Sequence, residues 1–375
     1  MANGTIYRNK ATQKLAAQFT IDGKRKAIAQ RKNETEKEFK KRFTQILNDI
    51  NQGNYIESVN ITFLDILKEH IDTKYKTNQV VGRTHLRDLE TVKQIEKCCK
   101  DFVKLPIQKI TVFHIKKALP NLIKYSNNTI DKIYRLINKT FKIAVSDRII
   151  NYNPMESESI KKPKSNKEDK KVTALTIEEH KKLIDVLEKN EHKYNNIILL
   201  QLYTGMRIGE VLALMNKDID LKNNTITIRR TLTRDEHDKT IMGNTTKTEN
   251  SKRTILINEK AKVILNKILK QQITNINGML FYDNQKDTFI TPNEINSYLK
   301  RLNEKEHIAD NLHSHMLRHT FATRCIESGM QSKALQEILG HKKIQTTLDI
   351  YTSVFKEFNQ VEVEKVNEYL SKQGI

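Results

Sequence analysis

Cysteine is scarce in this sequence. Only three of its 375 residues are cysteines, and two of them, Cys98 and Cys99, are adjacent. This spacing provides neither a disulfide framework nor the repeated C-x-x-C pairs of a structural zinc site. We therefore expect a protein of a reducing compartment.

Long apolar runs are also missing. The first ten residues contain no apolar core of a secretion signal, and no later segment approaches the length of about 20 apolar residues that crosses a bilayer. Phosphate-binding P-loops and paired-carboxylate metal motifs are absent as well. These absences predict a cytoplasmic protein that makes no membrane contact and uses no cofactor.

Acidic residues are too few to balance the basic ones. Lys and Arg number 66 against 45 Asp and Glu, which gives a formal net charge of +21. This excess makes an extended polyanion the first partner to consider, although a generally basic protein has the same composition. With 37% hydrophobic residues, the chain is long enough for two or three domains with cores of their own.

Residues 1–55 have the pattern of a small sheet followed by a helix. Strand candidates flank an Asp-Gly turn signal, at residues 5–8, 16–21 and 26–30. A capping box at residues 33–36 then precedes apolar residues at helical spacing. Residues 1–50 carry twelve basic and five acidic side chains. A small basic sheet can lie in a DNA groove, and a solvated basic face is the alternative.

Residues 58–155 show apolar residues at helical spacing in three main stripes, which begin at Phe63, Leu86 and Ile130. Prolines fall between the stripes, as expected at helix ends. We expect a helical bundle domain. A highly charged segment at residues 156–172 follows and is interpreted as an interdomain linker.

Residues 173–375 are expected to form the last domain. A capping box at residues 176–179 opens it, and its helical pattern gives way to β-type alternation around residues 224–258. The predicted fold class is therefore α+β, mainly α with small β-sheets.

Residues 313–329 read HSHMLRHTFATRCIESG and combine three histidines with Arg318. His315 and His319 share a helix face, as in a zinc-binding pair. Met316, however, occupies the place of the glutamate in the helical hydrolase motif, and no cysteine pair lies near in the sequence. His319 precedes apolar residues and is better explained as a packed histidine.

Other segments of the same domain supply what a phosphate site requires, namely fixed cations, a proton donor and a nucleophile. Arg207 lies where one apolar helix ends and the next begins, close to a helix N-terminus. Lys247 lies in the turn between two strand candidates. His341 follows a helix-ending glycine, and Tyr351 lies ten residues later.

The ordered motifs resemble those of a known family. They are T-G-x-R-x-G-E at Arg207, T-K-T-x-x-S-x-R at Lys247, H-x-L-R-H-T with His315 and Arg318, L-G-H at His341 and T-L-D-x-Y at Tyr351. The set resembles the tyrosine recombinases, or phage-type integrases, with all six active-site positions filled. Residues 58–155 resemble their core-binding, SAM-like domain. Residues 1–55 resemble the arm-type DNA-binding domain of integrases from phages and integrative conjugative elements.

The resemblance implies a transesterification mechanism. Tyr351 would attack a DNA phosphodiester, forming a 3′-phosphotyrosyl link and releasing a 5′-hydroxyl. Arg207 and Arg318 would bind the nonbridging oxygens, where charge builds in the transition state. His315 would be the general base, and Lys247 would protonate the departing oxygen.

The remaining positions would support this chemistry. His341 would hydrogen-bond the phosphate or position the tyrosine. Glu210 would orient Arg207 or a neighbouring histidine, and a plain surface charge is its alternative explanation. The apolar tail after Tyr351 would dock on a neighbouring protomer or pack on its own domain. The resemblance implies neither a metal nor a cofactor.

The family also implies partners and a biological role. We expect a homotetramer on double-stranded DNA that binds core and arm-type attachment sites, assisted by excisionase or DNA-bending proteins. Bound to DNA, it would be associated with the nucleoid. It would integrate and excise a mobile genetic element. The rival functions are relaxation of DNA by a type IB topoisomerase and DNA binding by a catalytically idle regulator.

Overall fold

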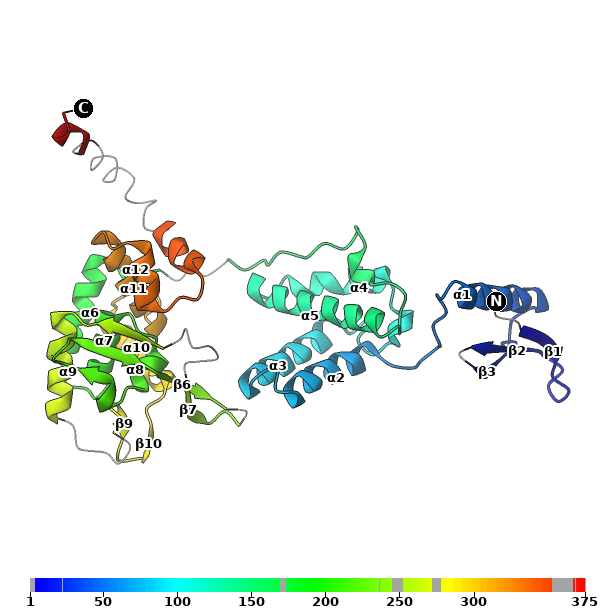
Figure 1. Cartoon of the computed structure of the whole chain (residues 1–375), viewed down its shortest axis with the longest axis horizontal. Coiled ribbons are helices and arrows are strands. Elements are labelled where there is room, and N and C mark those ends of the chain that lie inside the picture. Colours follow the sequence, from blue (N-terminus) through cyan, green and yellow to red (C-terminus); the bar gives the residue numbers. More distant parts are fainter. Residues whose placement is uncertain are drawn as a thin grey trace. The chain divides into compact units, whose positions relative to one another are not determined.

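The computed structural model describes most of the chain, namely residues 4–21, 23–168, 173–235, 237–244, 252–271, 278–352, 367 and 369–374. Lys247 and residues 353–366 of the apolar tail lie outside these described residues. The chain divides into two compact units, residues 1–169 and 170–375 (Figure 1).

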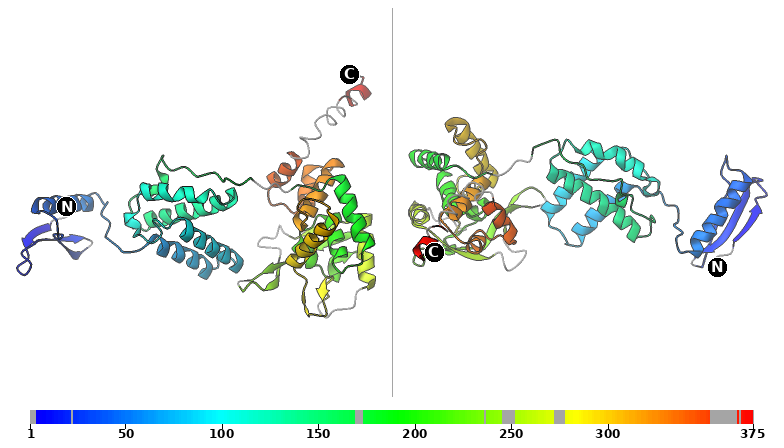
Figure 2. Two further views of the ribbon diagram at one scale, coloured as in Figure 1. Left: turned by 180° about the vertical axis from the view of Figure 1, so that it is seen from behind. Right: turned by 90° about the horizontal axis from the view of Figure 1, so that it is seen from above.

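The first unit begins with an antiparallel sheet in the order β1-β2-β3 and a helix, α1. Their bounds are Gly4–Arg8, Leu15–Ile21, Lys24–Ala29 and Glu36–Asn51. Thr35 caps α1 in a reciprocal capping box with Glu38. Phe39 and Phe43 of α1 pack against Phe19 of β2, so the helix covers one face of the sheet (Figure 2).

Helices make up the rest of the first unit. They are α2 (Phe63–Lys76), α3 (Gly82–Cys98), α4 (Val112–Ala118) and α5 (Asn127–Ser146), with 3-10 turns at Ile107–Lys109, Leu119–Leu122 and Pro154–Glu156. Three aromatic rings join these elements. The centroid of Phe63 lies 5.2 Å from that of Phe102 and 5.1 Å from that of Phe141. All three side chains are buried in one apolar core.

The first part of the expected linker packs on this helical core. Ile160 is buried in it. The backbone N–H of Asn166 donates to the carbonyl of Ile123 at 2.9 Å, and Lys162 forms an ion pair with Asp131 of α5.

The second unit is mostly helical and includes two small antiparallel sheets. Its helices are α6 (Ile177–Lys189), α7 (Asn195–Thr204), α8 (Ile208–Leu212), α9 (Glu259–Gln271), α10 (Pro292–Glu306), α11 (Ser314–Glu327) and α12 (Ser332–Leu339), with a 3-10 turn at Asn216–Asp218. Its strands are β4 (Ile219–Asp220), β5 (Thr225–Ile228), β6 (Arg230–Arg234), β7 (Thr240–Asn244) and β8 (Arg253–Leu256). Residues 344–352 are also helical.

Helix α7 forms the centre of this unit. Its side chains are apolar nearly all round, and most are buried, as expected for a helix enclosed by others. It packs against α9 and α11 (Figure 1). The β-type run expected at residues 224–258 divides into two sheets, because β5 pairs with β4 and β8 whereas β6 pairs with β7. A further hairpin, β9 (Tyr282–Asp283) with β10 (Thr288–Phe289), is too short to show in the sequence pattern.

The predicted fold class, mainly α with small antiparallel sheets, is confirmed by these elements. Within the described part of the chain, no helix combines the length and apolar character needed to span a membrane.

We predict that Phe63→Ala lowers the free energy of unfolding of the helical part by about 3–5 kcal/mol, because it removes a buried ring and leaves a cavity. Amide hydrogen exchange of α2, α3 and α5 in the full-length chain would report the loss. Phe113→Ala is the matched control, since Phe113 is 72% exposed, and should change stability by about 0.5 kcal/mol or less. Equal protection in the two variants would contradict the assigned core.

Candidate active site

The turn between α7 and α8 positions the first residues of the candidate site. Gly205 ends α7 in the left-handed conformation, with φ of 64°, a region that favours glycine. A Cβ here would lie 2.2 Å from the Phe321 ring of α11. The tight approach allows the Gly205 carbonyl to accept a hydrogen bond from Arg318 Nη1 at 2.8 Å. The chain then turns, and Arg207 becomes the N-cap of α8.

Glu210 lies at the centre of the charged contacts, and its residue is only 4% exposed. Its carboxylate accepts from the backbone N and from Nη1 of Arg207, both at 2.9 Å. It also accepts from Nη1 and Nη2 of Arg253, at 3.0 and 2.7 Å. Burial alone would raise the pKa of Glu210, but the hydrogen bonds and charges of Arg253 and Arg207 lower this pKa to about 2. Glu210 is therefore a buried, ionised carboxylate, and the alternative explanation of a plain surface charge is wrong.

Arg318 is buried on α11 and bonded to carbonyls. Its Nη1 donates to Gly205, and its Nη2 donates to the carbonyl of Leu339 at the end of α12, at 2.7 Å. Burial, together with the positive charge of Arg207, lowers the pKa of Arg318 to about 9. The guanidinium is thus still charged at neutral pH but poorly compensated, which makes an incoming anion favourable.

His341 enters the site through the turn after α12. Gly340 ends that helix with φ of 65°, and its carbonyl accepts from Arg207 Nη2 at 3.2 Å. The next residue, His341, has its Nδ1 2.9 Å from Oγ1 of the buried Thr347. Burial and the positive charges of Arg318 and Arg207 lower the pKa of His341 to about 4. The ring is therefore neutral at physiological pH.

His315 and His319 lie one turn apart on α11, with ring centroids 5.8 Å apart in an edge-to-face arrangement. Desolvation by the surrounding protein, then the charge of Arg318, lowers the pKa of His315, so its imidazole can accept a proton at neutral pH. Burial lowers the pKa of His319 to about 4. Nowhere in the described residues do three or more metal-ligating side chains lie together in one place.

Tyr351 packs against an apolar cluster formed with residues of α11 and α12. Its ring contacts an apolar cluster that includes Cys325, Leu335 and Ile350. Its hydroxyl donates to the backbone carbonyl of Met330. Burial raises the pKa of Tyr351 above its ordinary value of 10.0, so at neutral pH the phenol keeps its proton until a base removes it.

The structure thus brings several of the expected residues together. Arg207, Glu210 and Arg318 share one network with the turn that carries His341. The electrostatic neighbours of His315 include Arg318 and Arg207. The hydroxyl of Tyr351 is bonded to the backbone carbonyl of Met330.

Most of the chain is similar to known proteins. Residues 173–357 match the phage integrase family, and residues 62–166 match the phage integrase SAM-like domain. Over 342 residues the chain is 30% identical to an integrase of Staphylococcus phage L54a, a match that covers 84% of this chain and 95% of that protein. The chain belongs to the phage integrase family.

Two further similarities agree with this membership. A tyrosine recombinase XerA of Saccharolobus solfataricus is 34% identical over 194 residues, which cover 52% of this chain and 56% of that protein. A solved structure of the Tn1549 transposon integrase in complex with transposon right end DNA has the same fold, with a TM-score of 0.68, 24% identity and coverage of 82% of this chain and all of that one. The resemblance found in the sequence is confirmed, and the protein is a tyrosine-type site-specific recombinase.

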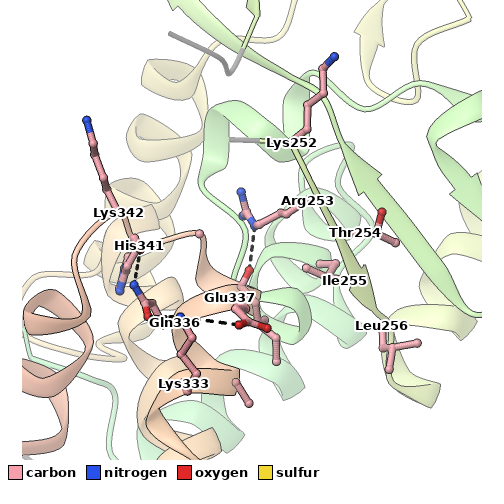
Figure 3. Close-up of a pocket in the computed structure, with 13 residues that line it drawn as sticks. Lys252, Arg253, Thr254, Ile255, Leu256, Lys333, Gln336, Glu337, His341 and Lys342 are labelled. Atoms are coloured by element: carbon pink, nitrogen blue, oxygen red, sulfur yellow. Dashed lines mark hydrogen bonds and ion pairs between the residues drawn. The ribbon is translucent and has the colours of Figure 1, made fainter. Parts of the chain in front are cut away.

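Arg253 is a member of the Glu210 network that sequence reasoning missed. It is the last residue of the T-K-T-x-x-S-x-R motif, to which only a lysine was assigned. The available signal was an arginine at a fixed distance from that lysine. Arg253 lines a pocket of about 840 Å³ between β8, α12 and the turn to His341 (Figure 3).

We predict that the recombinase loses stability as the pH falls from about 6.5 towards 4. In the folded protein the pKa values of His319 and His341 are about 4, below the value of about 6.5 in the unfolded chain. The contribution of these histidines to folding stability is therefore complete above about pH 6.5. It is lost as the pH falls, because the unfolded chain takes up protons that the folded protein does not. His319→Gln should flatten the fall of the melting temperature between pH 7 and 4.5. His237→Gln alters an exposed histidine and should leave the slope unchanged; parallel curves for all three proteins would contradict this account.

Proposed function

We propose that the recombinase binds the scissile phosphate of double-stranded DNA between Arg207 and Arg318 and opens it with Tyr351. The observation that carries this proposal is the charge of the site. In the described residues of the network, three guanidiniums surround the one carboxylate of Glu210. A phosphodiester would offset the remaining positive charge, and the charge that develops on its oxygens during attack would be stabilised most.

Each arginine has a distinct place in this mechanism. Arg207 has a side chain that is 47% exposed, so it can meet the DNA first. Arg318 is buried and held by two carbonyls, so it can bind a nonbridging oxygen with little reorganisation. Loss of either guanidinium would cost roughly 3–4 kcal/mol of transition-state stabilisation, by analogy with a lost oxyanion donor.

The reaction is a transesterification. His315 takes the phenolic proton, Tyr351 Oη attacks phosphorus, and the bond to the 5′ oxygen breaks with a proton from Lys247. His341 hydrogen-bonds the phosphate. The hydroxyl of Tyr351 must first leave the carbonyl of Met330, to which it is bonded in this structure. The phosphotyrosyl link conserves the energy of the broken bond, so a 5′-hydroxyl from another duplex can reverse the step.

The biological role that we infer is integration and excision of a mobile element. The relatives support it, since one is a phage integrase and another is a transposon integrase bound to transposon end DNA. Four protomers would act on two duplexes, with excisionase or DNA-bending proteins as accessory partners. The helical part, residues 58–155, would bind the core site, and the assembly would be nucleoid-associated while bound.

The N-terminal sheet is proposed to bind arm-type sites. Its strand register places one set of side chains on the face away from α1, where Tyr7, Gln18, Thr20 and Arg25 are all exposed. Such a polar and basic face has the size and chemistry to lie in a DNA groove. The excess of basic residues in this segment makes the binding electrostatic and sensitive to salt.

We predict covalent trapping on nicked suicide duplexes taken from the ends of the element. Wild type should yield a denaturation-resistant adduct through a 3′ phosphate, and Tyr351→Phe should yield none, because it lacks the nucleophile. Tyr369→Phe makes the same change at an exposed tyrosine and should react like wild type. A bound, correctly matched duplex that gives no adduct with wild type would favour the idle DNA-binding regulator.

We predict that deletion of residues 1–55 weakens binding to arm-type DNA and spares cleavage of core sites. A finer test is Arg25→Ala on the open face of the sheet, which should lower the slope of log affinity against log salt by about 1 for arm DNA. Lys37→Ala removes the same charge from the exposed side of α1 and is the matched control. Equal arm affinity in full-length and truncated chains would refute the assignment.

A further inference from the structure

Arg253 connects three elements around the proposed phosphate site. It begins β8, and its side chain is 10% exposed. Its Nε donates to the carbonyl of Ile338 near the end of α12 at 2.9 Å. Its two Nη atoms donate to the two carboxylate oxygens of Glu210 on α8. Figure 3 shows Arg253 close to the last turn of α12, while Lys252 points away.

The same guanidinium supports the turn that carries His341. A Cβ placed on Gly340 would lie 2.8 Å from Nη1 of Arg253 and 3.0 Å from its Cζ. The turn therefore rests directly on the planar group, and only a glycine fits there. The carbonyl of Gly340 in turn accepts from Arg207. Arg253 thus contacts both neighbours of Arg207, which are Glu210 and the Gly340 turn.

The charge of Glu210 makes this contact consequential. A buried carboxylate needs close compensation. If Arg253 were absent, the charge of Arg207 alone would have to supply it. Arg207, which already donates to Glu210, would be held there more strongly, and the negative carboxylate would oppose a phosphate bound beside it.

We propose that Arg253 is a positioning residue for DNA cleavage, which neutralises Glu210 and fixes the Gly340 turn so that Arg207 remains available to the phosphate. This inference rests on the proposed function of Arg207. In this proposal Arg253 acts through Glu210 and the Gly340 turn and does not itself take part in the reaction. Its role is to hold the charge and the position of the groups that do.

The decisive comparison is the coupling between Arg253 and Glu210. The rate of single-turnover adduct formation is measured on the nicked core duplex for the full-length chain carrying Arg253→Gln, Glu210→Gln or both changes. We expect Arg253→Gln to slow the reaction about 10- to 100-fold, by analogy with the residues that hold metal ligands in place. The double variant should react faster than Arg253→Gln alone, because no uncompensated carboxylate then remains to capture Arg207.

Two further variants separate positioning from folding. Arg253→Lys keeps the positive charge but not the two-pronged hydrogen bond, and it should retain a higher rate than Arg253→Gln. Arg230→Gln is the matched control, since Arg230 pairs with the buried Asp218 in the same unit. It should lower the melting temperature without slowing adduct formation by the folded protein. If Arg253→Gln does not fold, the double variant and Arg253→Lys test the proposal in its place. Both are expected to fold and to form adduct.

The outcomes are distinguishable. No adduct with wild type on a bound duplex would overturn the proposed function and this inference together. A normal wild-type adduct with an unchanged rate for folded Arg253→Gln would overturn the inference alone. A double variant as slow as the product of the two single effects, or Arg253→Lys as slow as Arg253→Gln, would also overturn it, since a purely structural arginine behaves in that way.

Discussion

The site depends on a buried ion pair in which one carboxylate serves two arginines. Glu210 binds Arg207 and Arg253 with hydrogen bonds of 2.7 to 3.0 Å. Breaking such a pair by removing one partner is costly, because the remaining charge stays buried. The network therefore fixes α8, β8 and the end of α12 relative to one another, and the groups proposed to bind phosphate are held by the same contacts.

Two glycines make the network possible. Gly205 and Gly340 both adopt left-handed conformations, and each presents a carbonyl to an arginine of the site, Arg318 and Arg207 respectively. A side chain at either position would collide with Phe321 or Arg253. The backbone thus approaches the cations closely and accepts hydrogen bonds without cancelling their charge, since carbonyls carry none. This arrangement leaves positive charge for an anionic substrate.

The tyrosine is organised differently from the cations. Tyr351 lies in an apolar cluster with its hydroxyl on Met330, whereas the arginines are joined by polar contacts. The arginine network is proposed to bind the phosphate, whereas the proposed nucleophile packs in an apolar cluster that follows the turn at His341. In the proposed mechanism a reaction at phosphorus requires the two to meet, so the position of the helical residues 344–352 would control when cleavage begins.

Several helix boundaries and the family could be predicted from the sequence, because the signals for them lie within a few neighbouring residues. The capping box of Thr176 with Glu179, and the glycines at Gly205 and Gly340, act within a few residues, so they predicted these three helix boundaries correctly. The capping box expected at residues 33–36 was wrong by two residues, because Thr35 and Glu38 form it. The motifs around Arg207, Arg318 and Tyr351 identified the family because their residue types and order are specific.

The tertiary structure alone decided which charges meet. Arg253 lies 43 residues from Glu210, and Tyr351 lies 21 residues from the Met330 carbonyl that it binds; such pairs depend on how helices and strands pack, and no periodicity within a single segment records them.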